Sequence, residues 1–166
     1  MGQRESSSAA SYFDDSERDA AIYQSHAPEL VRYANSLVGP NDAADVVSSA
    51  VLKAFTSKSW AAVENHRAYL YRAVLNEVRS QYRSTMRRQA REQRAAVPES
   101  VSLPEVRPEI LTALGALSAR QRAVAYLTYY EDLDERTVAE RLGISPGSVR
   151  KHLGRAREKL RSILDE

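Results

Sequence analysis

The 166-residue sequence predicts an all-α protein of two small helical domains joined by a flexible linker, with a helix-turn-helix in the second domain. Apolar residues recur at helical spacing on both sides of a stretch that is rich in proline. Glycine and proline number only six each, while Ala, Leu, Arg and Glu, which favour helices over strands, are abundant. Cysteine is absent, which excludes disulfides, thiolate metal sites and cysteine nucleophiles.

The N-terminal 19 residues are serine-rich, charged and poor in apolar side chains, and this composition predicts a disordered tail. The first domain is expected over residues 20–88. Its first helix is predicted at about 20–38, with a kink or a fresh start at Pro28. Gly39 and the proline after it predict the end of that helix, because glycine suits the C-terminal cap and proline cannot continue the helix.

Two further helices are expected in this domain. Asp42 can cap the second helix, and a polar loop that contains Trp60 separates it from the third. The third helix is expected from about His66 to residue 83 or beyond. Its predicted buried face consists of Tyr71, Leu75, Val78 and Tyr82.

Residues 89–107 lose the helical pattern and contain prolines, so they are predicted to form the linker. The second domain is expected over residues 108–166. Ser118 and Gln121 have the spacing of a capping box, in which each side chain accepts a hydrogen bond from the other residue's backbone N–H.

Residues 134–153 have the pattern of a helix, a tight turn and a second helix. Asp134 can cap the first helix, Gly143 suits a turn with positive φ, and Ser145-Pro146 is a helix start. A second helix of this kind fits the major groove of DNA. An ordinary helical hairpin with a charged face is the alternative. The outward-facing residues are Ser148, Arg150, Lys151 and Arg155.

Charge is distributed unevenly along the chain, although the net charge is only +2. Residues 1–66 hold five Lys/Arg against nine Asp/Glu, residues 67–94 hold eight against two, and residues 145–162 hold six against one. Two basic blocks in a nearly neutral protein indicate two contacts with a polyanion. Two solvated helix faces would produce the same pattern.

Several classes of protein are not supported by the residues present. The three histidines lie far apart, no clustered carboxylates suggest a catalytic centre, and no cofactor or metal is predicted. No apolar run approaches the ~20 residues that span a bilayer, and the N-terminus has no signal-peptide pattern. We therefore expect a cytoplasmic binding protein without catalytic residues and without membrane insertion.

Segments of both domains resemble the extracytoplasmic-function sigma factors, the smallest of the sigma factors. In the second domain the similar segments begin at Leu117, Tyr129, Gly147 and Arg155. In the first domain, residues 42–47 are similar to the family's polymerase-docking helix, and residues 68–76 to its promoter-melting helix. The two halves occur in the family's order and at its separation.

The resemblance implies a promoter-specificity subunit with three kinds of contact. Core RNA polymerase would contact Asp45, and an anti-sigma factor is a further expected partner. The minus-ten promoter DNA would be bound by Trp60, Asn76, Arg79, Ser80 and Arg83. The minus-thirty-five duplex would be bound by Ser145, Ser148, Arg150, Lys151 and Arg155.

Alternatives to these roles stay open from the residues alone. Trp60 could instead cover the core of its domain, Asn76 could be a structural amide, and Asp45 could be an ordinary helix-face carboxylate. The family often has Gln-Glu where Ser48 and Ser49 stand here, which leaves the polymerase contact open in detail. The competing function is a regulator that binds DNA through the helix-turn-helix without acting as an initiation subunit.

Overall fold

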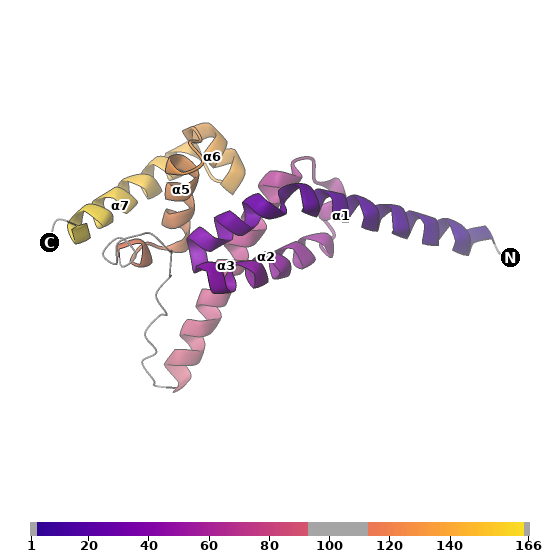
Figure 1. The fold of residues 1–166 in the computed structure, drawn as a ribbon, viewed down its shortest axis with the longest axis horizontal. Helices are drawn as coiled ribbons and strands as arrows, with labels where there is room; N and C mark the ends of the chain where they lie inside the picture. The colour runs from indigo at the N-terminus through magenta and orange to yellow at the C-terminus, as the bar shows by residue number, and fades with distance from the viewer. Residues whose placement is uncertain (1–2, 93–112, 165–166) are drawn as a thin grey trace.

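A computed structural model describes residues 3–92 and 113–164 of the chain (Figure 1). These residues form helices, and no strand occurs among them. The first domain contains α1 (Gln3–Val38), α2 (Pro40–Phe55), a short 3-10 helix (Trp60–Ala62) and α3 (His66–Glu92). The second contains α5 (Ala119–Tyr129), α6 (Glu135–Leu142) and α7 (Pro146–Leu164). The predicted all-α class is confirmed, whereas most of the predicted linker lies outside the described residues.

Helix α1 differs from the prediction at its N-terminal end. It begins at Gln3, within the stretch for which a disordered tail was predicted, and it continues without interruption through Pro28. The physical reason is that extending an existing helix adds one hydrogen bond per residue fixed, so a helix nucleated in the packed part can propagate outward. Asp19 within this stretch accepts a hydrogen bond from the indole of Trp60, at 2.8 Å, which ties this part of α1 to the domain.

Helix α2 begins three residues earlier than predicted, and Asp42 is not its cap. Gly39 occupies the cap position with φ 88°, and Pro40 is the first helical residue. Proline is favoured there because its missing N–H would have no partner in the first turn and its φ is already helical. Asp42 lies in the first turn, where a negative charge interacts favourably with the helix dipole.

Helix α3 is the longest element of the first domain after α1, and its outer half projects from the body of the molecule (Figure 1). Tyr71, Leu75 and Val78 are buried as predicted. The prediction that Tyr82 belongs to this buried face is wrong, because its side chain is 64% exposed. The helix continues past the last buried position, Val78, and so leaves Tyr82 uncovered.

The local signals of the second domain are confirmed. Ser118 and Gln121 form both hydrogen bonds of the capping box. The Asp134 carboxylate accepts from the backbone N–H of Thr137 at 2.7 Å, and Gly143 has φ 64° at the turn. These contacts fix the angle between α6 and α7 and thereby orient the outward face of α7.

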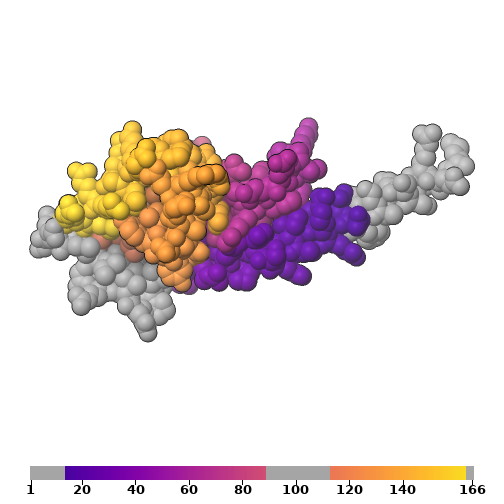
Figure 2. Space-filling model, turned by 90° about the horizontal axis from the view of Figure 1, so that it is seen from above, coloured from indigo at the N-terminus to yellow at the C-terminus, as the bar shows by residue number. Residues whose placement is uncertain are grey.

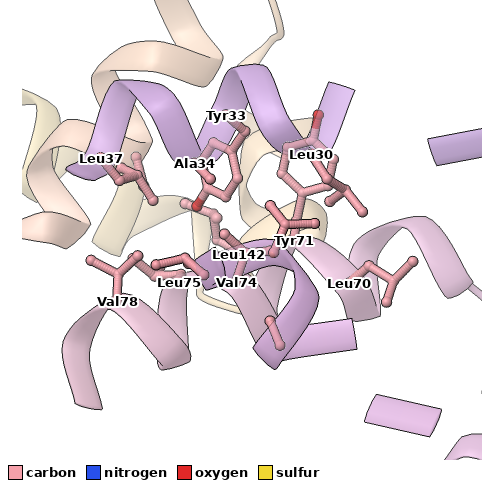
Figure 3. Packing of buried hydrophobic residues seen from close by; sticks show 14 of the residues in the cluster. Leu30, Tyr33, Ala34, Leu37, Leu70, Tyr71, Val74, Leu75, Val78 and Leu142 are labelled. Atoms are coloured by element: carbon pink, nitrogen blue, oxygen red, sulfur yellow. The ribbon is translucent and has the colours of Figure 1, made fainter. Parts of the chain in front are cut away.

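The two domains pack against each other and share one apolar core. Figure 2 shows the second domain, in orange and yellow, in direct contact with the first. Figure 3 shows Tyr33 of α1, Tyr71 of α3 and Leu142 of α6 pointing into the same interior. None of the helices in the described ranges is long and apolar enough to cross a membrane.

Candidate nucleic-acid and polymerase interfaces

An open groove of about 660 Å³ lies between α2 and α3, and we call it the α2–α3 groove. Asn76, Ser80 and Arg83, three of the five residues predicted to bind the minus-ten element, line it together. They recur at four and three residues along α3, which places them on one face of the helix. Tyr69 and Arg72 extend the same face toward the start of α3 and also line the groove.

The other two predicted residues lie elsewhere. Trp60 is 3% exposed, and its ring packs against Phe55 and Tyr69, with ring centres 4.9 and 5.5 Å apart. The structure therefore shows Trp60 covering the core of its domain, which was the alternative interpretation of this residue. Arg79 is half-buried outside the groove lining, where burial and the charges of Arg120 and Arg83 lower the pKa of its guanidinium.

One wall of the groove is an internal charge pair. The Glu77 carboxylate is buried and accepts hydrogen bonds from Lys53 at 2.5 Å, Ser49 at 3.0 Å and Gln81 at 3.1 Å. Burial alone would raise the pKa of Glu77, but these three bonds outweigh it and hold the pKa below its usual value. Ser49 is therefore occupied inside the domain, and of the serine pair only Ser48 is exposed.

The Glu77 cluster makes folding stability depend on pH. Because the native pKa of Glu77 is lower than its ordinary value of 4.5, its stabilising contribution is present above about pH 4.5 and is lost as the pH falls through the native pKa. Glu77→Gln is expected to lower the free energy of unfolding at pH 7 by about 1–3 kcal/mol. Urea unfolding from pH 7 to pH 3 should show a shallower acid loss for the variant than for the wild type. Equal slopes would contradict this role.

The outward face of α7 carries the second predicted DNA surface. Arg150, Lys151 and Arg155 are exposed, while Ser148 is half-buried at the start of the helix. Ser145 caps α7, because its hydroxyl accepts from the Ser148 backbone N–H at 3.1 Å. The face therefore combines two hydroxyls at the helix start with three cations on the following turns.

Two neighbours modify this face. The Arg150 guanidinium donates to the Glu135 carboxylate at 2.6 Å, so this arginine is already oriented by α6. His152 is half-buried behind the face, and burial lowers the pKa of its imidazole, as do the charges of Arg120, Arg155 and Lys151. Within the described ranges no carboxylate pairs with Lys151 or Arg155. The ammonium group of Lys151 and the guanidinium group of Arg155 are therefore available to an anion.

The exposed face of α2 is a third candidate surface. Asp45, Ser48 and Leu52 are exposed, and their spacing of three and four residues places them in one row. Leu52 was not singled out from the sequence, although it is 66% exposed. Its position seven residues after Asp45 indicates that Leu52 lies on the same face of the helix, because two helical turns bring a side chain back to that face.

Comparison with known proteins gives matches over both domains. Residues 22–88 match the model of sigma-70 region 2, and residues 107–160 match that of sigma-70 region 4. The chain is similar to the ECF RNA polymerase sigma factor SigL of Mycobacterium tuberculosis, at 32% identity over 156 residues and 88% of each chain. It is also similar to the RNA polymerase sigma-E factor of Streptomyces avermitilis, at 29% identity over 82% of this chain and 79% of the relative.

Two solved structures have a similar fold. One is the sigma factor RpoE in complex with the anti-sigma factor NepR from Bartonella quintana, with a TM-score of 0.68 and 24% identity over 92% of this chain and 97% of the other. The other is CnrH in complex with the cytosolic domain of CnrY, with a TM-score of 0.59 and 26% identity over 90% and 89%. The sequence matches cover both domains in the order expected from the residues, and they show that the chain belongs to the extracytoplasmic-function sigma factors, which direct RNA polymerase in transcription initiation.

Proposed function

We propose that this sigma factor binds the minus-ten element in the α2–α3 groove and the minus-thirty-five duplex on the outward face of α7. Core polymerase would dock on the exposed row of α2 at Asp45, Ser48 and Leu52. The observation that carries the proposal is the meeting of Asn76, Ser80 and Arg83 in one groove beside an aromatic ring. The competing idea of a regulator that binds DNA only through the helix-turn-helix gives no role to residues 22–88, which match region 2.

The chemistry of the groove suits a base that has left the duplex. Removing one base from the stack costs a few kcal/mol, and a polar pocket with an aromatic side chain can offset this cost. Tyr69 lines the groove and is half-buried, so its ring takes the place first assigned to Trp60. Asn76 offers both a donor and an acceptor to the base edge, while Arg72 and Arg83 offer positive charge to the backbone.

The face of α7 suits duplex DNA. Arg150, Lys151 and Arg155 are exposed on one helix, and residues near the start of such a helix reach base edges in the major groove. Arginine can bind guanine through two hydrogen bonds, and lysine can bind a phosphate or a base acceptor. Binding energy alone would drive the melting of the promoter, and this chain would contribute no catalytic chemistry.

A protein partner is proposed from the structural relatives. Both similar structures are complexes, and the RpoE structure holds an anti-sigma factor. We propose that an anti-sigma factor also binds this chain. Because RNA polymerase acts in the bacterial cytoplasm, we propose the same location for the chain.

The proposal is tested by transcription in vitro with purified core polymerase, the chain and two templates. One template carries a duplex promoter, and the other carries the same promoter opened in advance around the minus-ten element. On the duplex template, Asn76→Ala is expected to lower transcript yield about tenfold, which corresponds to an activation free energy higher by about 1.4 kcal/mol. On the opened template, the transcript yield of the same variant is expected to return to that of the wild type. Asp45→Arg is expected to lower the yield on both templates, because it weakens docking.

Three outcomes would contradict the proposal. Core polymerase without the chain could make the same transcripts, which would remove the promoter-recognition role. Asn76→Ala could lose activity equally on both templates, which would remove the groove from base capture. Unchanged polymerase affinity of Asp45→Arg would remove Asp45 from the docking surface.

A further inference from the structure

An ion pair joins the two helices of the helix-turn-helix at its outer surface. The Arg150 guanidinium of α7 donates through Nη1 to Oε1 of Glu135 at 2.6 Å. Glu135 is the first residue of α6, and its side chain is 37% exposed, while that of Arg150 is 69% exposed. Because pairs as exposed as this one contribute little to folding stability, the main consequence of the contact is that it fixes where the guanidinium lies.

The two helices are held together by other contacts. Val138 and Ala139 of α6 and Val149 of α7 are buried in one apolar core. The turn between the helices is fixed at Gly143, which has φ 64° and lies against the Arg72 side chain of α3, since a β-carbon there would stand 2.7 Å from Cδ of that arginine. Loss of the ion pair would therefore release a side chain without moving a helix.

The Arg150 guanidinium lies back over the first turn of α7. Its Nη2 and the Ser145 hydroxyl both lie 3.9 Å from the position that a β-carbon would take on Gly147. Residues at the start of a recognition helix are the ones that reach base edges in the major groove. The ion pair therefore holds this guanidinium at the end of α7 where a base sequence can be recognised.

Glu135 distinguishes Arg150 from the other two cations on the outward face of α7. Among the residues that the structure describes, no carboxylate pairs with Lys151 or Arg155, so both are free to bind a phosphate. A guanidinium has five N–H donors, and the bond to Glu135 uses one of them and gives the others a fixed direction. A guanine edge requires that direction, because it binds arginine through two parallel hydrogen bonds.

The Glu135 carboxylate also places a negative charge on a surface that is otherwise cationic. Its position in the first turn of α6 favours this charge, because the helix dipole is positive there. A phosphate that approached the Arg150 guanidinium would be repelled by the carboxylate, whereas a guanine edge carries no net charge. A repulsive element of this kind increases specificity by weakening binding of the wrong partner.

We infer that Glu135 sets the sequence specificity of the α7 face, as a positioning residue that acts through Arg150. It directs the guanidinium to a guanine edge and prevents it from serving as one more phosphate contact. The inference rests on the proposed binding of duplex DNA by α7. It gives α6 a part in base recognition besides its packing against α7.

The test measures the affinity of the full chain for two duplexes by fluorescence anisotropy. One duplex has the sequence that the wild-type chain enriches from a pool of random duplexes, and the other is a scrambled duplex of the same base composition. Glu135→Ala is expected to lower the ratio of the two affinities about tenfold, which is within the range for loss of one base contact. On the scrambled duplex it is expected to steepen the salt slope by about 1, because the released Arg150 gains a phosphate.

Three further variants assign the effect to the ion pair. Glu140→Ala removes the same charge from the same helix, where Glu140 pairs with Arg136 at 3.7 Å, and is expected to leave the affinity ratio unchanged. Glu135→Gln keeps an oxygen that can accept from Arg150 and is expected to retain most of the ratio. In an Arg150→Ala background, Glu135→Ala is expected to change the ratio no further, because the residue through which it acts is gone.

An unchanged affinity ratio in Glu135→Ala would overturn the inference, even if the wild-type chain selects a sequence. An equal fall in Glu140→Ala would do the same, since a general effect of charge would then explain both variants. A further fall in the Arg150→Ala background would overturn the action through this arginine. A wild-type chain that enriches no sequence would instead count against the proposed binding of duplex DNA by α7, on which the inference rests.

Discussion

Trp60→Ala is expected to lower the free energy of unfolding by about 3–5 kcal/mol, the usual cost of removing a large buried aromatic side chain. The ring is 3% exposed and packs against Phe55, His66 and Tyr69, so its removal leaves a cavity among three aromatic neighbours. The measurement is urea unfolding followed by far-ultraviolet circular dichroism, because the variant loses the only tryptophan of the chain.

Trp60→Phe is the matched variant for this prediction. It keeps an aromatic ring but removes the indole N–H that donates to Asp19, so a smaller loss of about 1–3 kcal/mol is expected. Promoter opening by Trp60→Phe should remain close to the wild type at a temperature where both are folded. Failure of Trp60→Phe to open the promoter at a temperature where it is folded would instead restore Trp60 as a base-stacking residue.

Replacing both Arg150 and Lys151 by alanine is expected to weaken binding of minus-thirty-five duplex by about 2–6 kcal/mol, if each side chain reads a base edge worth about 1–3 kcal/mol. Both side chains are exposed on the first turns of α7, where a recognition helix approaches the bases. Fluorescence anisotropy with a labelled duplex, measured at several salt concentrations, gives both the affinity and its salt dependence.

The single variants separate base reading from phosphate binding. A base contact loses affinity for the cognate sequence only, whereas a phosphate contact weakens all sequences alike and lowers the salt slope by about 1. Glu135→Ala serves as the control for Arg150, because it removes the carboxylate that holds the guanidinium at 2.6 Å. Wild-type affinity in the double variant would exclude this face of α7 as the duplex-binding surface.

Local signals in the sequence were enough for the second domain. The capping box at Ser118, the cap at Asp134 and the turn at Gly143 each depend on residues within a few positions, and the structure contains all three. The periodicity of α3 also predicted that Asn76, Ser80 and Arg83 share a face, because helical spacing alone determines this.

Contacts between distant residues could not be predicted in the same way. Trp60 is buried because Asp19 of α1 accepts its N–H and because α2 and α3 supply aromatic neighbours, none of which local spacing reveals. Tyr82 continues the apolar pattern of α3 but lies beyond the elements that would cover it. The contact of Arg72 with Gly143 depends on how the two domains pack, which is a tertiary property.

The long N-terminal helix has a consequence for how the protein would behave in solution. Its 36 residues amount to about 54 Å at 1.5 Å per residue, whereas a compact chain of this size has a radius of gyration of about 15 Å. Figure 1 shows this rod extending well beyond the body of the molecule. Friction grows with such an extension, so a monomer should elute from a sizing column earlier than a sphere of 18.6 kDa, without any self-association.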